Sequence, residues 1–343
     1  MGLGAVRGVA LACCIILPVL GCRQPETVAS ASKPSSNGPD PLFPVHHDYP
    51  AWSAQGVIAY EDYGIFCVDS LSGAYLPPDT SLAGLWTVNP STGDKHRLLA
   101  AGTMPAWSRH GSKLAVVIGV SIFTMNADGS ELRRLTSAGM NLFPSWNMDG
   151  TWIAFQSTVS TFPNVWIMRP DGSDKQIVGD EAGEYPCWSP VEPVILHTRF
   201  LVGFYGAELY TMDERRHFLN ATRISNDRAD DRAPDYSPDG RQIAFSSQWR
   251  EGILKPQIWV MNCDGTGVRQ LTQNGGLHPS WSPDGSKIVY ARHDWTINTP
   301  ENGVLWVIDM TTGTESQLTF KWPQRCTTSV RDVSWTDVRK KFR

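Results

Sequence analysis

One stretch of this chain, Pro279 to Ala291, recurs in variant form along most of its length. It places an aromatic residue, Trp281, before Ser-Pro-Asp-Gly and follows that with an apolar run, Ile288-Val289-Tyr290. Pro-Asp-Gly predicts a tight turn, because proline fixes φ and glycine accepts a positive φ. The apolar run predicts a strand that is buried on both faces. One copy is a hairpin with no core of its own, so the copies must pack against one another.

Two further motifs recur between the aromatic anchors. The first is an aromatic strand that ends in Met shortly before Asp-Gly, as in the segment 258–265, and the second is a closing strand such as Arg269 to Thr272. Four short strands in each unit, repeated at this period, are typical of the blades of a β-propeller. The anchors lie 39 to 55 residues apart, at Trp52, Trp107, Trp146, Trp188, Tyr236, Trp281 and Trp335. We expect these aromatics to pack between neighbouring blades as structural residues.

The repeats therefore predict an all-β fold, a β-propeller of six four-stranded blades. Residues 333–335 resemble a seventh first strand. They either add to the first blade and close a six-bladed ring, or join residues 41–48 in a composite seventh blade. Closure is required in both cases, because an open ring leaves an unpaired strand edge. Six blades are the expectation that we carry forward.

The N-terminal residues are predicted to lie outside the propeller. Residues 1–21 have the charge and the short apolar run of a secretory signal. Their end, followed by Cys22, resembles the bacterial lipobox, in which the cysteine is lipid-modified and becomes the new N-terminus. Residues 22–49 are rich in Ser, Pro and Ala and predict a flexible tether. The propeller is expected at 50–338 and a basic tail at 339–343.

This layout predicts a protein held in the bacterial envelope by the lipid on Cys22. We expect it on the periplasmic side of the outer membrane, or on the extracellular face of the membrane in a cell that has one membrane. The formal net charge is −4 and no block of like charge stands out, which argues against a nucleic-acid partner. A monomer is expected.

The cysteines give no support for metal or redox chemistry. Cys67, Cys187, Cys263 and Cys326 form no C-x-x-C pair, and the sequence leaves their disulfide pairing open. The Asp-Gly turns lack the series of acidic ligands that a calcium loop carries. We therefore expect no cofactor and no bound metal.

The segments Trp281 to Ile288, Trp259 to Gly265 and Arg269 to Thr272 resemble the propeller repeats of the TolB family. The resemblance covers roughly residues 50–335 and implies the propeller fold. In that family the propeller follows an N-terminal α/β domain and partners such as Pal dock on it, whereas a tether precedes Pro50 here. Similar repeats also occur in peptidase propellers and in lyases of pectic oligosaccharides, so the resemblance implies less about function than about fold.

The lengths of the connections favour one face of the ring for binding. The first-to-second and third-to-fourth connections are mostly short Asp-Gly turns, and the variable connections lie on the opposite face. We expect that face to bind an envelope protein or a glycan through aromatic and charged side chains. The candidates are Tyr185, Phe204, Tyr205, Arg228, Asp231, Arg232, Trp249, Arg250, His293, Asp294 and Trp295.

The catalytic alternative is a metal-dependent lyase that acts on oligouronates or related polysaccharides. Its site would combine His197, His278 and His293 with Glu184 or Asp231. Against it, no two histidines have ligand spacing and no Gly-x-Ser-x-Gly motif occurs. The sequence therefore favours a non-catalytic binding or scaffolding propeller, with no catalytic residues assigned.

Overall fold

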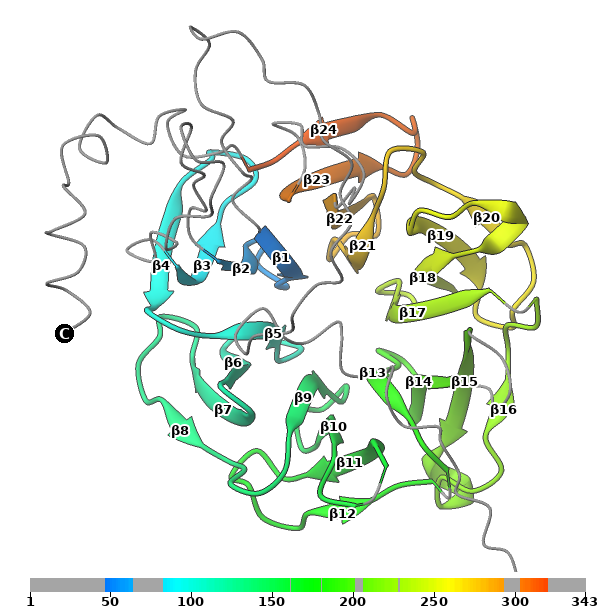
Figure 1. The fold of residues 1–343 in the computed structure, drawn as a ribbon. Coiled ribbons are helices and arrows are strands. Elements are labelled where there is room, and N and C mark those ends of the chain that lie inside the picture. Colours follow the sequence, from blue (N-terminus) through cyan, green and yellow to red (C-terminus); the bar gives the residue numbers. More distant parts are fainter. Residues whose placement is uncertain are drawn as a thin grey trace, which may run out of the picture. The chain divides into compact units, whose positions relative to one another are not determined.

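The computed structural model describes residues 47–63, 83–160, 162–179, 181–200, 206–227, 229–292 and 303–319. These residues form six antiparallel sheets of four strands, and the strands of each sheet pair in sequence order. Figure 1 shows the sheets arranged radially around a centre, with the first strand of each sheet innermost. The fold is a six-bladed β-propeller, as the repeats predict.

The strands of blades 1 to 3 are β1 (His47–Trp52), β2 (Ile58–Asp62), β3 (Gly84–Val88), β4 (Lys95–Leu99), β5 (Thr103–Trp107), β6 (Lys113–Ile118), β7 (Ser121–Asn126), β8 (Arg133–Arg134), β9 (Asn141–Trp146), β10 (Ile153–Ser157), β11 (Asn164–Met168) and β12 (Gln176–Ile177). Those of blades 4 to 6 are β13 (Glu184–Trp188), β14 (Val194–Phe200), β15 (Ala207–Asp213), β16 (Thr222–Arg223), β17 (Asp230–Tyr236), β18 (Gln242–Gln248), β19 (Gln257–Asn262), β20 (Arg269–Gln270), β21 (Leu277–Trp281), β22 (Lys287–Arg292), β23 (Val304–Asp309) and β24 (Glu315–Gln317). Within the described ranges the helical segments are two short 3-10 turns, η1 (Glu214–Arg216) and η2 (Arg250–Gly252).

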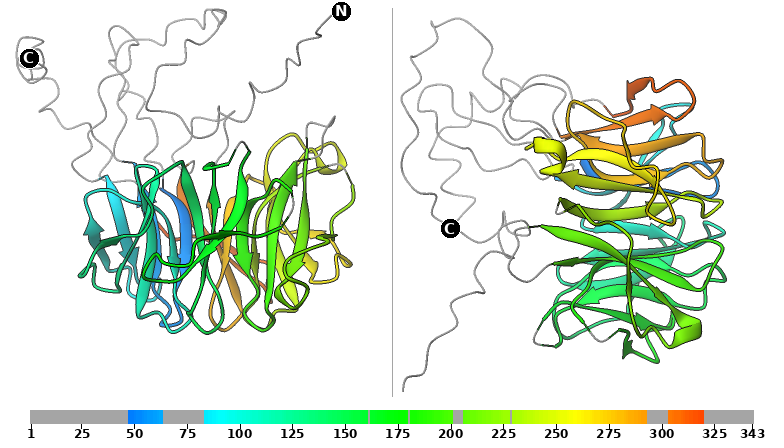
Figure 2. Two further views of the ribbon diagram at one scale, coloured as in Figure 1. Left: turned by 90° about the horizontal axis from the view of Figure 1, so that it is seen from below. Right: turned by 90° about the vertical axis from the view of Figure 1, so that its right-hand side faces the viewer.

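The strands run between two faces of the propeller, as the side views in Figure 2 show. We call the face at which each first strand ends the turn face, since it carries the first-to-second and third-to-fourth connections. The opposite face, with the second-to-third and fourth-to-first connections, is the loop face. Three of its connections, at residues 64–82, 201–205 and 293–302, lie outside the described residues.

The turns of the turn face are fixed by their own side chains. In the 282–286 turn, Asp284 Oδ1 accepts hydrogen bonds from the Ser286 backbone N–H (3.0 Å) and the Ser282 hydroxyl (2.6 Å). These hydrogen bonds to the ionised form lower the pKa of Asp284 to about 2. Gly285 follows at φ +71°, in the left-handed region. Asp284 belongs to an Asp-Gly turn of the kind found in calcium loops, but its carboxylate accepts hydrogen bonds from its own turn.

The anchor aromatics lie at the ends of the first strands and fill the junctions between blades. Trp281 is 6 % exposed and packs with Val260 of blade 5 and Tyr290 of blade 6. Other anchors pack in the same way at the 1–2, 3–4, 4–5 and 6–1 junctions, namely Trp107, Trp188, Tyr236 and Trp52. The seventh anchor, Trp335, lies outside the described residues. The hydrophobic core is thus divided into layers between adjacent blades.

The ring closes at His47, the first residue of β1. Its backbone N–H donates to the carbonyl of Gly303 (2.8 Å) in blade 6. Its imidazole Nδ1 hydrogen-bonds the Thr319 hydroxyl (2.7 Å), and Nε2 hydrogen-bonds Asp62 (3.1 Å). Because the Asp62 carboxylate only accepts, Nε2 carries the proton and Nδ1 accepts from the threonine hydroxyl. Blades 1 and 6 are each complete from consecutive strands, so this contact closes six blades without a borrowed strand in the described part of the chain.

We expect Trp281→Ala to lower the free energy of unfolding by roughly 3 to 5 kcal/mol, because a fully packed indole is lost between two blades. Urea denaturation followed by circular dichroism measures this change. Trp249→Ala is the matched control, since Trp249 is 41 % exposed, and it should change stability by no more than about 0.5 kcal/mol. Equal losses in the two variants would contradict the role of the junction.

We also expect His47 to contribute a loss of stability as the pH falls below about 6.5. Burial lowers the pKa of His47, so the folded state resists a proton that the unfolded chain binds. The stabilisation is complete above the unfolded pKa and is lost as the pH falls through the folded one. Denaturation between pH 7.5 and 5 measures the slope, which His47→Gln should reduce. The exposed control His96→Gln should keep it, and an unchanged slope in His47→Gln would refute the assignment.

Candidate functional site

Each first strand contains the same irregularity, a bulge at a residue with positive φ that precedes a proline. In β1 the register with β2 shifts between Asp48 and Ala51, and Tyr49 between them has φ 48°. Pro50 follows directly. A positive φ is unusual for a residue with a side chain, and here it occurs in all six first strands. The six residues are Tyr49, Met104, Phe143, Tyr185, Ala233 and His278.

These bulge residues line the centre of the ring, and four of them form an aromatic floor. Tyr49 stacks on His278 with ring centroids 4.1 Å apart, and Phe143 lies 4.0 Å from Tyr185. Tyr49 and Phe143, from blades 1 and 3, approach to 6.0 Å. We call Tyr49, Phe143, Tyr185 and His278 the aromatic floor. His278 is held in place by Asp48, whose carboxylate lies 2.6 Å from Nδ1.

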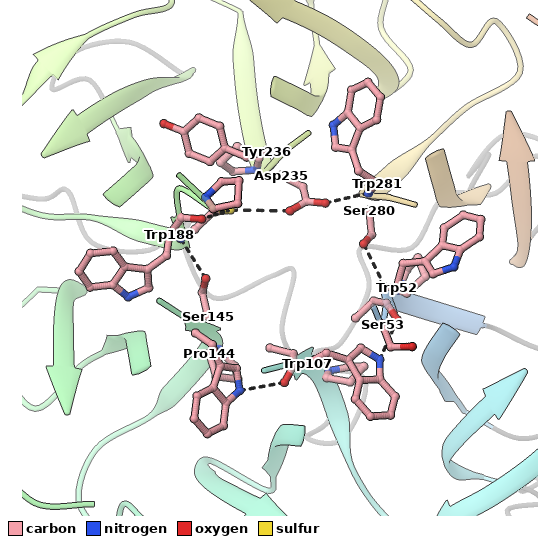
Figure 3. A pocket seen from close by; sticks show the side chains of 18 of the residues that line it. Trp52, Ser53, Trp107, Pro144, Ser145, Trp188, Asp235, Tyr236, Ser280 and Trp281 are labelled. Atoms are coloured by element: carbon pink, nitrogen blue, oxygen red, sulfur yellow. Dashed lines mark hydrogen bonds between the residues drawn. The ribbon is translucent and has the colours of Figure 1, made fainter. Parts of the chain in front are cut away.

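A central cavity of about 550 Å³ lies between this floor and the turn face. Its walls are the ends of the six first strands and the residues that follow them, including Ser53, Arg109, Met148 and Pro283. Figure 3 looks into it and shows the anchor side chains directed away from the centre, into the junctions between blades. The wall that faces the cavity is therefore built from backbone, proline rings and small side chains.

Hydrogen bonds surround the cavity at the junctions, and each joins an anchor to the residue that precedes the anchor of the previous blade. Figure 3 draws them at every junction except that between blades 4 and 5, where its dashed line joins Cys187 to Asp235. Where that residue is alanine, the anchor indole donates to its carbonyl, as Trp107 does to Ala51 (3.1 Å) and Trp146 to Ala106 (3.0 Å). Where it is polar, its side chain accepts from the backbone N–H of the anchor. Ser145 accepts from Trp188, Cys187 from Tyr236, Asp235 from Trp281 and Ser280 from Trp52. We call these contacts the junction hydrogen bonds.

Asp235 is the charged member of this set. Its Oδ2 accepts the Trp281 N–H at 2.8 Å, and the Cys187 sulfur lies 3.7 Å from Oδ1. Burial raises the pKa of Asp235 to about 6, against the hydrogen bonds that favour its ionised form. The same loss of solvation raises the pKa of the Cys187 thiol, which keeps it protonated. Asp235 is half-buried and lines the cavity.

Of the candidates predicted for the loop face, Tyr185 and Arg232 lie in contact, since the Arg232 side chain hydrogen-bonds that of Tyr185. Tyr185 belongs to the aromatic floor, and Arg232 pairs with Asp230 (2.8 Å) and stacks over Phe200 at 4.7 Å. Trp249 is exposed in the connection that follows β18. The remaining candidates lie outside the described residues and are Phe204, Tyr205, Arg228, His293, Asp294 and Trp295.

Asp231 and Arg250 are paired with each other inside the fold. Arg250 Nη2 donates to both carboxylate oxygens of Asp231 (2.9 and 2.8 Å), and Ser247 donates to Oδ1 at 2.6 Å. Arg250 also pairs with Asp227, while Glu208 accepts from Arg223 at 2.6 Å. Asp231 has no exposed surface and Arg250 is 8 % exposed. The pair therefore joins β17 to η2 and presents little surface to a partner.

The residues of the lyase alternative do not assemble into a metal site in the described parts of the chain. The carboxylates of Glu208, Asp227 and Asp231 approach within 4.8 Å of one another, but the guanidinium of Arg250 already neutralises two of them. His278 is bound to Asp48. His197 is 3 % exposed, and burial lowers its pKa to about 4, so it is a neutral core residue. His293 lies outside the described residues.

Sequence reasoning missed most of the cavity, including Tyr49, Phe143 and Asp235. A signal for it is nevertheless present, because a proline stands two residues before every described anchor. These prolines are Pro50, Pro105, Pro144, Pro186, Pro234 and Pro279. A proline inside a strand indicates an edge or a bulge, and six at one position indicate a ring of bulges.

Both faces carry exposed apolar side chains. On the loop face, Val159, Phe162 and Leu254 are 53, 60 and 73 % exposed. On the turn face, Met148 and Val268 are 47 and 40 % exposed, and of these two only Met148 lines the cavity. Among the described residues, no helix has the length and apolarity needed to cross a bilayer. Cys187 and Cys263 are free thiols, and Cys22, Cys67 and Cys326 lie outside the described residues.

Comparison with known proteins gives the following matches. Residues 186–321 match the family described as the TolB beta propeller domain. A stretch of 74 residues is 35 % identical to the Tol-Pal system protein TolB of Geobacter sulfurreducens, and it makes up 21 % of this chain and 17 % of that protein. The matched stretches span a quarter or less of the length of the curated relatives.

Solved structures extend the likeness to most of the chain. TolB from Acinetobacter baumannii is 20 % identical with a TM-score of 0.53, over 80 % of this chain and 67 % of that one. An oligogalacturonate lyase solved with manganese is 14 % identical with a TM-score of 0.53, over 82 % and 78 % of the two chains. Identities this low establish a shared fold and do not distinguish between the functions of the two neighbours.

We expect Arg250→Met to lower the free energy of unfolding by roughly 3 to 5 kcal/mol, because it leaves Asp231 buried without its cation. Arg241→Met is the control, since the Arg241 side chain is 86 % exposed and its contact with Asp239 is long (3.9 Å); it should change stability by at most about 0.5 kcal/mol. Urea denaturation compares the two. A stable Arg250→Met protein would return Arg250 to the candidates for partner binding.

Proposed function

We propose that this TolB-like β-propeller protein is a non-catalytic binding module, which holds a segment of an envelope protein or a glycan in its central cavity. The observation that carries the proposal is the cavity itself, which is about 550 Å³ in volume and has an aromatic floor. Concave, mostly apolar sites with a few polar groups are typical of ligand pockets. The cavity opens on the turn face, so the proposal places the ligand opposite the face that loop length favours.

The shape of the cavity supports a binding role. Its walls come from six separate blades, which are fixed to one another by the junction hydrogen bonds. Little rearrangement is therefore needed when a ligand enters, and a preorganised site loses less free energy on binding. The floor residues Tyr49, Phe143 and Tyr185 offer aromatic surface, and Ser145 and Ser280 offer hydroxyl groups at the wall.

A catalytic role has less support in the described residues. The carboxylates that lie close together are paired with Arg250 and Arg223, and His278 is bound to Asp48. General acid–base catalysis needs a group that can reach the substrate in the right protonation state. His197, which is buried and neutral, does not meet that requirement. Asp235 lines the cavity and has a pKa of about 6, but the neighbouring Cys187 thiol has a raised pKa and stays protonated, so it is not an activated nucleophile. The likeness to the lyase of oligogalacturonate concerns the fold and does not add a site.

The place of action that we propose is the bacterial envelope, with the lipid on Cys22 as the membrane contact. This part of the proposal rests on the lipobox-like end of the signal and on the tether composition of residues 22–46, since residues 47–49, which we expected in the tether, belong to β1. A single tether of this length would let the propeller reach partners away from the membrane surface.

Affinity capture from cross-linked envelope extracts tests the cavity, with three arginine substitutions at exposed apolar positions. Met148→Arg places a charge at the cavity mouth and should abolish capture. Val268→Arg, on the same face but away from the cavity, and Leu254→Arg, on the loop face, should retain it. Loss with Leu254→Arg and retention with Met148→Arg would move the binding surface to the loop face and overturn the proposal.

A further inference from the structure

The residue before the anchor has one structural task in every blade, which is to accept a junction hydrogen bond. The six residues at this position are Ala51, Ala106, Ser145, Cys187, Asp235 and Ser280. In five blades the task is performed by a neutral residue. Ser280 accepts the Trp52 N–H at 3.1 Å, and Ser145 accepts the Trp188 N–H at 3.0 Å. A serine is therefore sufficient for the junction, and the negative charge of Asp235 is not required by it.

The charge of Asp235 also has a cost, because a carboxylate that leaves water must be compensated. No cation lies among the groups that hold it, which are the Trp281 and Tyr236 N–H groups, the Cys187 thiol and the Ser280 hydroxyl. The incomplete compensation is visible in the raised pKa, about 6. An acidic group that the fold does not need, and that faces a cavity, is a functional candidate.

We infer that Asp235 binds a primary ammonium group on an alkyl stem, such as a lysine side chain of a protein partner, that enters the central cavity from the turn face. This inference rests on the proposed function and specifies the ligand class of the same cavity. The stem would lie along the proline-rich wall, between Asp235 and the aromatic floor. The ammonium group would pair with the carboxylate in place of water.

The geometry favours an ammonium group over a guanidinium group. An arginine fork needs two acceptors that are free along one edge. Both oxygens of Asp235 already have partners, which include the Trp281 N–H at 2.8 Å, the Cys187 thiol at 3.7 Å and the Ser280 hydroxyl. These donors occupy most of the roughly four lone-pair positions that a carboxylate offers, so no edge with two free acceptors remains for a guanidinium group. A lysine ammonium needs a single acceptor direction, which it gains at Oδ1 by replacing the weak contact with the thiol.

The small number of oxygen ligands in the cavity disfavours a divalent cation. Calcium takes six to eight oxygen ligands, and magnesium takes six in a regular octahedron. Asp235 is the one carboxylate among the residues that line the cavity. The other charged or titratable groups there are Arg109 at the mouth, Cys187, His278, Tyr49, Tyr185 and Tyr236. One carboxylate and a few hydroxyl groups do not make a divalent site.

The test uses the full chain with Nα-acetyl-lysine methylamide as the probe and Nα-acetyl-norleucine methylamide as its uncharged counterpart. Met104 lies in the cavity wall and is 8 % exposed, so its ¹³C-methyl resonance, assigned with Met104→Leu, reports occupancy. We expect the lysine probe to bind at least about tenfold more tightly than the norleucine probe, which corresponds to ~1.4 kcal/mol. Equal affinities would overturn the inference, as would tighter binding of the arginine analogue or of calcium chloride.

Asp235→Ser is the decisive variant, since serine keeps the junction hydrogen bond as it does in blades 3 and 6. It should retain the fold, by circular dichroism, and lower the affinity for lysine to that for norleucine. Ser145→Asp provides an independent check that does not remove any group from blade 5. It places a second carboxylate at the matching position of blade 3 and should strengthen lysine binding. Unchanged lysine binding in both variants would refute the inference.

The pH dependence of lysine binding distinguishes the contribution of the Asp235 carboxylate from that of the other groups in the cavity. With the Asp235 pKa at about 6, lysine affinity should fall about tenfold between pH 7.5 and 5, and Asp235→Ser should abolish this dependence. His278→Gln, repeated over the same range, should leave it in place, because His278 belongs to the floor and is paired with Asp48. A profile that follows His278 instead would overturn the inference.

The two proposals can fail separately. If the lysine and norleucine probes bind equally while Met148→Arg still abolishes capture, the cavity is the binding site and the ligand class is wrong. If the lysine probe binds through Asp235 while Met148→Arg retains capture, the ammonium site stands and the partner docks elsewhere.

Discussion

The junction between neighbouring blades is the constraint on which the rest of this structure depends. A single four-stranded blade is apolar on both faces, as the complete burial of Ile288, Val289 and Tyr290 in β22 shows. Such a sheet can be stable in water only if both faces are covered. The neighbours cover them, and each anchor aromatic fills the gap between two blades. The ring must therefore close, and His47 performs this closure between Thr319 and Asp62.

The junctions also produce the cavity. The backbone of each first strand must bring its anchor into the junction and still allow the residue before it to reach the next blade. Every first strand has a bulge at a residue with positive φ just before this point, and a bulge re-aims the side chains of a strand. The residues at the bulges, Tyr49, Phe143, Tyr185 and His278 among them, converge at the centre and form the floor. The central cavity therefore results from the same bulges that allow the junctions between the blades to form.

Because the junctions repeat, departures from the repeat stand out. Serine and alanine at the position before the anchor are explained by the junction alone, but Asp235 is not. In the same way, Asp284 in a turn is explained by the hydrogen bonds that cap it. A repeat protein thereby supplies its own reference for each residue. The comparison with sibling blades separates structural side chains from candidate functional ones without recourse to relatives, whose likeness here extends mainly to the fold.

The sequence by itself determined the blades. The spacing of the anchors, the Asp-Gly turns and the apolar runs were enough to predict six four-stranded units, because each is a local pattern set by turn geometry and burial. The sequence did not decide which side chains face the centre, since a bulge breaks the alternation that such a prediction relies on. Nor did it reveal that Arg250 forms an ion pair with Asp231, which lies 19 residues away in the chain. Only the tertiary structure brought Tyr49, Tyr185 and Asp235 to one cavity, because closure of the ring joins residues that are far apart in the chain.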